Sequence, residues 1–174
     1  GLTLTLSDER DPTPHDELTE EDIEDRRDVS YHYAGGIADF VTYLNSSKGP
    51  ANPTVIHFED ETPDQHMAAE VALQWNQGFS ESVFTFANTI NTVGGGTHEE
   101  GFRAALTTLM NKFAREWGIL KEKQPNLSGE DIREGLTAIV SVKLAEPQFE
   151  GQTKGKLGNT EAKTFVQKMV NDHL

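Results

Sequence analysis

Two kinds of hydrophobic pattern divide this chain of 174 residues into predicted elements. Short segments in which apolar and polar residues alternate, or in which apolar residues run on, are typical of β-strands. Strands are predicted on this basis at residues 2–6, 31–33, 55–58, 65–75, 82–91 and 136–144. The first segment places Leu2, Leu4 and Leu6 on one face, so we expect a half-buried strand there. Because the chain opens inside this strand, we also expect it to be a fragment of a longer protein.

The segments 65–75 and 82–91 are expected to form an antiparallel hairpin. Both alternate apolar and polar residues, and the turn sequence Asn76-Gln-Gly78 lies between them. Asn and Gly adopt the backbone angles of tight turns at low cost, which favours direct pairing of the two strands. The strongly apolar segment 136–144 is expected to be a buried, central strand.

Apolar residues spaced three or four positions apart predict helices. This spacing occurs at residues 37–44, 98–117 and 160–174, and a short capped helix is expected within 126–135. The strongest signal is one stripe of apolar residues at Phe102, Ala105, Leu106, Leu109, Phe113 and Trp117. Thr97 and Glu100 have the spacing of a capping box at the start of that helix. Asn159 is expected to cap the last helix.

The order of these elements is strand, strand, helix, three strands, helix, short helix, strand and helix. Strands and helices therefore do not alternate regularly, which favours an α+β fold in a single domain over residues 1–174. We expect a mostly antiparallel sheet with helices packed on one face.

Residues 11–28 have the composition of a disordered acidic insertion. They contain nine acidic and two basic side chains, so half of the net charge of -14 lies in this segment. Only Leu18 and Ile23 could be buried, and such a segment cannot offset the entropy lost on ordering. The overall charge argues against nucleic acid as a partner. However, residues 103–174 carry a net charge of +2, so a basic face in that part stays open.

Several chemistries are excluded by composition and spacing. There is no cysteine, and no apolar run is long enough to span a membrane. The six histidines are scattered without the spacing of a zinc motif, so we expect no metal site. No nucleophile elbow or Walker loop is present, and the carboxylates cluster in the acidic segment. The sequence therefore indicates no self-contained catalytic site.

A glycine-rich loop after the central strand carries two candidate binding residues. The run from Glu146 to Gly158 bends at one proline and three glycines, and Gln152 and Lys154 lie at its tip. A lysine on such a loop can carry a positive charge to an anion. Most lysines in loops have no chemical role, so the residue types alone favour a solvated surface loop.

This loop resembles one found in bacterial type IIA DNA topoisomerases. The run EPQFEGQTKGKLGN, residues 146–159, is similar to the loop that DNA gyrase B and its topoisomerase IV counterpart extend from their transducer domain into the ATP site. The runs QWNQGFSES, FANTINT, GGTHEEGFRAAL and DIREGL extend the resemblance over about residues 29–174. The acidic insertion and the amino-acid sequences of the motifs resemble those of actinobacterial members of the family.

The resemblance implies a fold and a division of labour. The fold would be like domain two of ribosomal small-subunit protein five, with a left-handed βαβ crossover. A preceding ATPase domain of the GHKL type, absent from this chain, would bind ATP and Mg²⁺ and supply the catalytic base. Gln152 and Lys154 would contact the γ-phosphate and couple hydrolysis to DNA strand passage and negative supercoiling. This chain alone is then expected to bind no cofactor and to be inactive.

The resemblance also implies partners and a cytoplasmic location. These partners are gyrase A in an A2B2 heterotetramer, double-stranded DNA, and a second copy of gyrase B when ATP binds. Arg103 and Lys112 are candidates to face DNA, although a solvated helix face is the alternative for both. Gly94 departs from the family, which usually has an acidic residue there, and this predicts a looser hinge.

Two other functions stay open at this point. The equivalent domain of the topoisomerase IV counterpart, which serves decatenation, has the same parts. A stand-alone interaction or RNA-binding domain with this fold is an alternative of another class, in which Lys154 would be dispensable.

Overall fold

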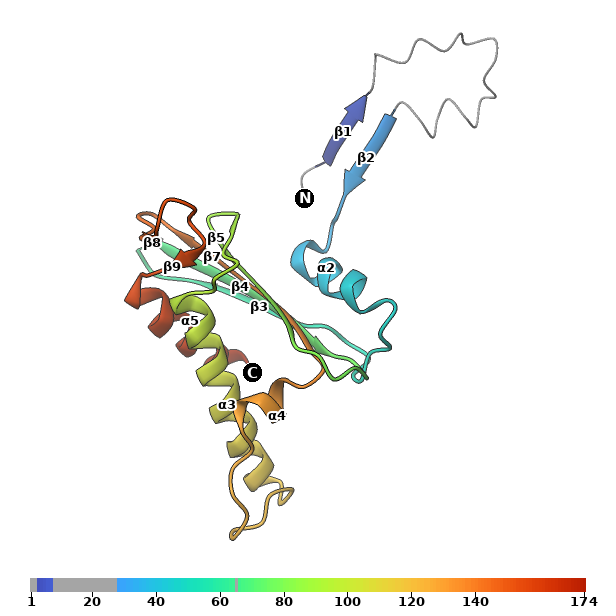
Figure 1. Cartoon of the computed structure of the whole chain (residues 1–174), viewed down its shortest axis with the longest axis vertical. Coiled ribbons are helices and arrows are strands. Elements are labelled where there is room, and N and C mark those ends of the chain that lie inside the picture. Colours follow the sequence, from blue (N-terminus) through green and yellow to red (C-terminus); the bar gives the residue numbers. More distant parts are fainter. Residues whose placement is uncertain (1–2, 8–27, 65) are drawn as a thin grey trace, which may run out of the picture.

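The computed structural model describes residues 3–7, 28–64 and 66–174, which form a mixed α+β architecture (Figure 1). Five strands make one mixed sheet in the order β3-β4-β7-β5-β6. These strands are β3 (Ile56–Glu61), β4 (Met67–Trp75), β5 (Ser82–Ala87), β6 (Ile90–Asn91) and β7 (Leu136–Leu144). β7 lies at the centre, as predicted from its apolar run. It pairs antiparallel with β4 and parallel with β5.

The predicted hairpin of segments 65–75 and 82–91 is wrong. β4 pairs along its whole length with β7, from Met67 opposite Leu144 to Trp75 opposite Leu136, and its other edge pairs with β3. β5 therefore has no free edge of β4 to join, and it pairs with β7 instead. A parallel pair needs a long crossover. Helix α3 (Thr97–Glu116) lies in that crossover.

Helices cover both faces of the sheet, whereas we predicted them on one face only. Helices α3 and α5 (Thr160–His173) lie on one face, and α2 (Gly36–Asn45) lies on the other (Figure 1). Successive residues of a strand point to opposite faces, so Val140 joins the core under α3 and α5 while Ile139 packs near Val41 of α2. The continuous apolar pattern of β7 is that of a strand buried on both faces.

The core on the α3–α5 face confirms the predicted stripe of α3 except at its end. Phe102, Ala105, Leu106 and Leu109 are buried, whereas Trp117 is 73% exposed just past the helix. The predicted capping box at Thr97 is wrong. Gly96 occupies the N-cap position, and the buried hydroxyl of Thr97 has no hydrogen-bond partner among the described residues. A capping box does occur at α4 (Gly129–Arg133), between Ser128 and Asp131.

A buried polar cluster fixes α2 on its face of the sheet. The side chain of Asn45 donates to Gln74 Oε1 at 2.9 Å and accepts from Thr137 Oγ1 at 2.7 Å. Asn76 Nδ2 donates to the same oxygen of Asn45 at 3.2 Å. All four side chains are buried, so each needs these partners. The cluster joins α2 to both β4 and β7.

Strands β1 (Thr3–Ser7) and β2 (Asp28–His32) form a separate antiparallel ribbon beyond α2 (Figure 1). Leu4 lies opposite Tyr31 and Leu6 opposite Val29, so these apolar side chains share one face. Leu4 is 51% and Leu6 55% exposed, so the predicted half-buried strand is wrong for the described residues. The predicted insertion 11–28 lies outside the described residues, apart from the backbone of its last residue, which begins β2.

Candidate functional site

The loop with the predicted binding residues is the turn of a small hairpin between β7 and α5. Strand β8 (Phe149–Glu150) pairs antiparallel with β9 (Lys156–Leu157). An ion pair joins Lys156 Nζ to Glu150 Oε1 at 3.2 Å. Gly151 and Lys154 turn the chain with φ angles of +77° and +53°. For Lys154 this left-handed conformation is strained, and such strain is concentrated at functional sites.

The tip of this hairpin presents its polar side chains to solvent. Gln152, Thr153 and Lys154 are all exposed. Within residues 3–7, 28–64 and 66–174, no hydrogen bond or ion pair engages the amide of Gln152 or the ammonium of Lys154. Because neither group has an intramolecular partner in this part of the chain, both can bind an external group without first breaking a bond.

One side of the loop base is held by Asn159. Its Oδ1 accepts the backbone N–H of Gln148 at 2.6 Å, and its Nδ2 donates to the carbonyl of Glu146 at 3.1 Å. Asn159 is 1% exposed and occupies the N-cap position of α5, as predicted, but its side chain makes no capping hydrogen bond. Nδ2 also donates to Glu161, which lowers the pKa of that carboxyl below its usual value.

The other side of the loop base is held by the glycine segment 94–96, which precedes α3. Gly94 N–H donates to the carbonyl of Gly155 at 2.8 Å, and Leu157 N–H donates to the carbonyl of Gly95 at 3.1 Å. Gly96 forms a parallel bridge with Leu157, and a Cβ atom at Gly96 would overlap the Leu157 carbonyl oxygen. The segment therefore needs glycine for close approach to the loop. The looser hinge predicted from Gly94 stays a prediction.

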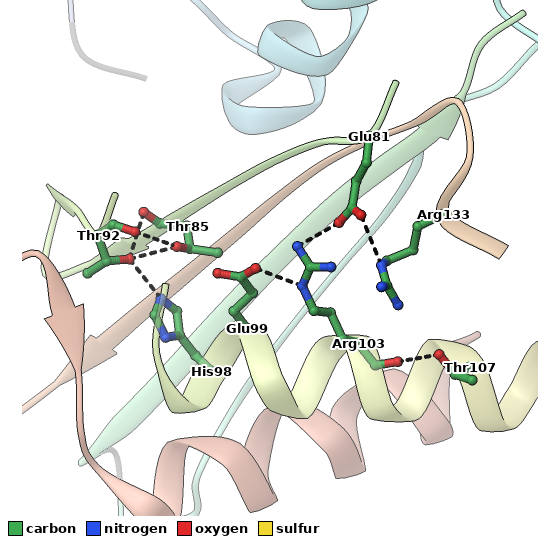
Figure 2. A network of polar contacts seen from close by, with 8 residues as sticks. All are labelled: Glu81, Thr85, Thr92, His98, Glu99, Arg103, Thr107 and Arg133. Carbon is green, nitrogen blue, oxygen red and sulfur yellow. Dashed lines mark hydrogen bonds and ion pairs between the residues drawn. The ribbon is translucent and has the colours of Figure 1, made fainter. Parts of the chain in front are cut away.

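Thr92 and His98 flank the glycine segment and contact each other. Thr92 Oγ1 lies 3.2 Å from His98 Nε2, and the hydroxyl of Thr85 on β5 lies 2.7 Å from that of Thr92 (Figure 2). His98 has no exposed surface, and its burial lowers the pKa to about 4. The imidazole is therefore neutral at physiological pH. Its Nδ1 has no hydrogen-bond partner among the described residues.

Arg103, predicted to face DNA, lies in a network of ion pairs between α3 and the sheet (Figure 2). Its guanidinium contacts Glu99 at 2.7 Å and Glu81 at 2.6 Å, and Glu81 also pairs with Arg133 at 3.2 Å. Partial burial lowers the pKa of Arg103, but the two carboxylates outweigh this and raise it above its usual value. Two arginines and two carboxylates carry no net charge, so this cluster offers little positive charge to an outside group.

Lys112, the other candidate to face DNA, lies on the outside of α3. Its side chain is 58% exposed, with Glu116 at 3.9 Å and the ring of Phe113 at 5.4 Å from Nζ. An exposed pair at this distance is weak, so the ammonium is available to other anions. Arg103 and Lys112 do not form one basic patch, since Arg103 is held inside its own network.

The described residues lack two other kinds of feature. No group of three or more His, Cys, Asp or Glu side chains in this part of the chain could hold a metal ion. Across the same residues, none of the helices is both long and apolar enough to cross a membrane.

Comparison with known proteins identifies the family. The family model described as DNA gyrase B matches residues 36–174. This chain belongs to the DNA gyrase B family. The B subunit of DNA gyrase from Streptomyces coelicolor is 62% identical over the whole chain, and that from Mycolicibacterium smegmatis is 48% identical. Both relatives are actinobacterial, in agreement with the resemblance of the motifs.

The fold comparison agrees with membership of the DNA gyrase B family. The crystal structure of the 43K ATPase domain of Thermus thermophilus gyrase B, in complex with an aminocoumarin, matches with a TM-score of 0.76 at 36% identity. The match covers 84% of this chain and 38% of that one. The chain spans only 26% of the Streptomyces coelicolor protein and 28% of the Mycolicibacterium smegmatis protein.

The sequence patterns did not point to the residues that support the loop in this DNA gyrase B family member. The six histidines, His98 among them, were predicted only not to form a zinc motif, and Asn159 was predicted only to cap a helix. The spacing of Thr92 and His98 around three glycines was a usable signal, because polar residues at both ends of a flexible segment can fix its shape. No local pattern could have shown that Glu81 pairs with Arg103, since they meet only in the folded chain.

Proposed function

We propose that this chain is the transducer domain of a DNA gyrase B protein. It would couple ATP binding and hydrolysis in an adjacent GHKL domain to DNA strand passage and negative supercoiling. Gln152 and Lys154 are the proposed contacts to the γ-phosphate. The observation that carries this assignment is the contrast within one hairpin: the base is fixed on both sides, while the cation and the amide at the tip are exposed and unpaired among the described residues.

The chemistry of the tip suits a phosphate sensor. An ammonium and an amide N–H are both donors, and a γ-phosphate offers three anionic oxygens to them. These contacts last only while the γ-phosphate is present, so its release removes the affinity of the loop for the nucleotide site. The adjacent domain can then move relative to this one. β7 and α5 flank the hairpin and would transmit that movement.

The adjacent ATPase domain is proposed to supply ATP and Mg²⁺ binding and the catalytic base. The described residues of this chain include no cluster of metal ligands. We therefore assign both cofactors to the full-length protein and none to this chain alone.

The β1–β2 ribbon is the proposed docking element for the ATPase domain. A two-stranded ribbon is at best marginally stable alone. Leu4, Leu6, Val29 and Tyr31 line one face and are each at least 40% exposed. An adjoining domain that covered this face would bury their apolar surface, at about 25 cal/mol per Å². The relatives are long enough to contain such a domain.

The finer fold assignment and the partners are parts of the same proposal. We propose a single transducer domain over residues 1–174, related to domain two of ribosomal small-subunit protein five, with a left-handed crossover from β5 to β7. Its partners would be gyrase A in an A2B2 heterotetramer, a second gyrase B on ATP binding, and double-stranded DNA near Arg103 and Lys112. Because its substrate is chromosomal DNA, the enzyme would act in the cytoplasm.

The equivalent domain of the topoisomerase IV counterpart is the alternative within this enzyme class. Supercoiling by the holoenzyme favours gyrase, whereas decatenation alone favours topoisomerase IV. The stand-alone interaction or RNA-binding alternative predicts that Lys154 is dispensable.

The decisive experiment compares Lys154→Ala with Lys168→Ala in the full-length protein. Lys168 is an exposed lysine on α5, outside the loop, with its side chain 73% exposed and paired to Asp172. We expect Lys154→Ala to lower ATP turnover at least tenfold, or about 1.4 kcal/mol of barrier, and to abolish supercoiling with gyrase A. Lys168→Ala should retain both. Normal turnover with lost supercoiling would move Lys154 from hydrolysis to coupling, and survival of both activities would refute the assignment.

A further inference from the structure

We propose that Thr92 and His98 form a clamp that positions the Gln-Thr-Lys loop, which makes both of them positioning residues for the γ-phosphate contact. The inference rests on the proposed function of Lys154 and adds two residues that never touch the nucleotide. They would act through the glycine segment 94–96, which lies between them in the chain.

The clamp closes the glycine segment at both of its ends. Thr92 ends the strand region before it, His98 lies in the first turn of α3 after it, and their side chains meet at 3.2 Å (Figure 2). Within the segment, Gly95 N–H donates to the Thr92 carbonyl at 2.8 Å. Three glycines in a row have many accessible conformations. A contact across them restricts the segment to the shape that the loop requires.

Two buried hydroxyls and one imidazole share these hydrogen bonds. Thr92 Oγ1 lies 2.9 Å from the Thr85 carbonyl, 2.7 Å from Thr85 Oγ1 and 3.2 Å from His98 Nε2. A hydroxyl has one proton, so Thr92 donates to one of these neighbours and accepts from others. The Thr85 hydroxyl also lies 3.0 Å from the Thr92 carbonyl. A neutral imidazole takes part through Nε2 as donor or acceptor according to its tautomer, and burial holds it neutral.

The conformation of the glycine segment directly affects the position of the loop. Its backbone holds Gly155 and Leu157 through two hydrogen bonds of 2.8 and 3.1 Å. These residues lie just after Lys154 in the chain. A shift of the segment would therefore shift the end of the exposed tip, next to Lys154, and a displacement of about 1 Å in a positioning group is enough to impair catalysis.

A purely structural role for the clamp predicts a different outcome. If Thr92 and His98 only stabilised the fold, their loss would weaken every ligand alike. A positioning role instead affects only states that contain a γ-phosphate, because Lys154 and Gln152 have nothing to contact in ADP.

The test uses Thr92→Val in the full-length protein, with Thr92→Ser as the conservative rescue. Valine keeps the branched shape and removes the hydroxyl, whereas serine keeps the hydroxyl. His98→Phe tests the same contact from the other side and keeps an aromatic ring in the core. Thr108→Val is the matched control, because Thr108 is an exposed threonine of α3 whose hydroxyl donates to Ala104 of its own helix. Affinities for ADP and for a non-hydrolysable ATP analogue are measured together with kcat and KM.

We expect Thr92→Val and His98→Phe to lower the affinity for the ATP analogue and kcat between about twofold and tenfold, the range that one buried hydrogen bond controls. ADP affinity should stay unchanged, and Thr92→Ser should restore the loss. In a Lys154→Ala background, Thr92→Val should cause no further loss. Equal losses for ADP and the analogue, or full additivity with Lys154→Ala, would overturn the clamp. If Lys154→Ala alone has no effect, the proposed function fails first, which distinguishes the two failures.

Discussion

Asn159 closes the loop that carries Lys154, because its side chain bonds to the backbone at Gln148 and Glu146 at distances of 2.6 and 3.1 Å. A residue at an N-cap position usually directs its side chain to the helix. Here the side chain is turned to the preceding loop, and the helix start is left without a side-chain cap. The two hydrogen bonds tie the entry of the hairpin to the start of α5.

We expect Asn159→Ala to damage both stability and loop function. The change removes the side-chain partners of the Gln148 N–H and the Glu146 carbonyl. Each lost hydrogen bond costs about 0.5–1.5 kcal/mol of unfolding free energy. Urea denaturation of the 174-residue chain measures this loss. Thr160→Ala is the control, because Thr160 is exposed at the next position. A loss no larger than that of the control would mean that the loop base does not depend on Asn159.

Substitution of Gly96 tests the close approach of the glycine segment to the loop. A Cβ atom there would overlap the carbonyl of Leu157, so we expect Gly96→Ala to displace β9. The control is Gly118→Ala. Gly118 has a φ of +72°, but its added Cβ would meet nothing within 4 Å. Gly118→Ala should cost only about 1–2 kcal/mol, the penalty for an L residue in this region.

The difference between the two glycine variants contains the overlap together with the larger backbone penalty at Gly96, whose φ of 141° and ψ of -167° are adopted almost only by glycine. Gly96→Ala should lower the urea midpoint more than Gly118→Ala and should also lower ATP turnover in the full-length protein. Equal midpoints for the two variants would show that the loop yields to the added methyl group without cost.

The sequence predicted the elements of this fold better than their pairing. The apolar run of β7 showed that the strand is buried, and the stripe of α3 showed a helix that packs through Phe102 and Leu106. Periodicity is a local property, however, and cannot state which strand lies beside which. The predicted hairpin would place β5 beside β4. In the structure β7 lies between β4 and β5, although α3 and α4 separate β7 from β5 in the chain.

Some residues of the candidate site could be predicted from the local sequence, and others depend on contacts between distant parts of the chain. Gln152 and Lys154 could be chosen from their loop and its resemblance to a family. The supports of that loop could not, because Asn159 and Gly96 act through contacts that exist only after folding. Arg103 also depends on distant information. Its position on a helix could be predicted, but its ion pair with Glu81 could not, because the two residues meet only in the folded chain.

His98 should make the stability of the chain depend on pH. Burial lowers its pKa from 6.5 to about 4 in the folded chain. As the pH falls below 6.5, the unfolded chain binds a proton at His98 before the folded chain does. The free energy of unfolding should therefore fall between pH 6.5 and about pH 4, by up to about 3 kcal/mol, and be unaffected by this group above that range.

His98→Gln provides the reference for this pH dependence. Glutamine keeps a side chain that can donate or accept a hydrogen bond in place of the imidazole, and it does not titrate. Carboxylates titrate in both proteins, so their contribution cancels in the difference. Urea midpoints of the wild-type protein and of His98→Gln are measured from about pH 4 to about pH 8. The difference between the two midpoints should be constant at the upper end and should become smaller as the pH falls below 6.5. Parallel profiles would show that His98 keeps an ordinary pKa.

Lys112 should contribute more to DNA binding than Arg103, if this face of α3 meets DNA. The guanidinium of Arg103 already contacts Glu99 and Glu81, whereas the ammonium of Lys112 has only a weak pair with Glu116. Each lysine that neutralises a phosphate adds about 0.9 to the slope of log affinity against log salt on duplex DNA. We therefore expect Lys112→Ala in the full-length protein to reduce this slope by about one. Arg103→Ala should reduce it less, and Lys168→Ala on α5 should leave it unchanged. Equal slopes for the wild-type protein and Lys112→Ala would place DNA elsewhere, because a phosphate contact cannot be lost without a change in counterion release.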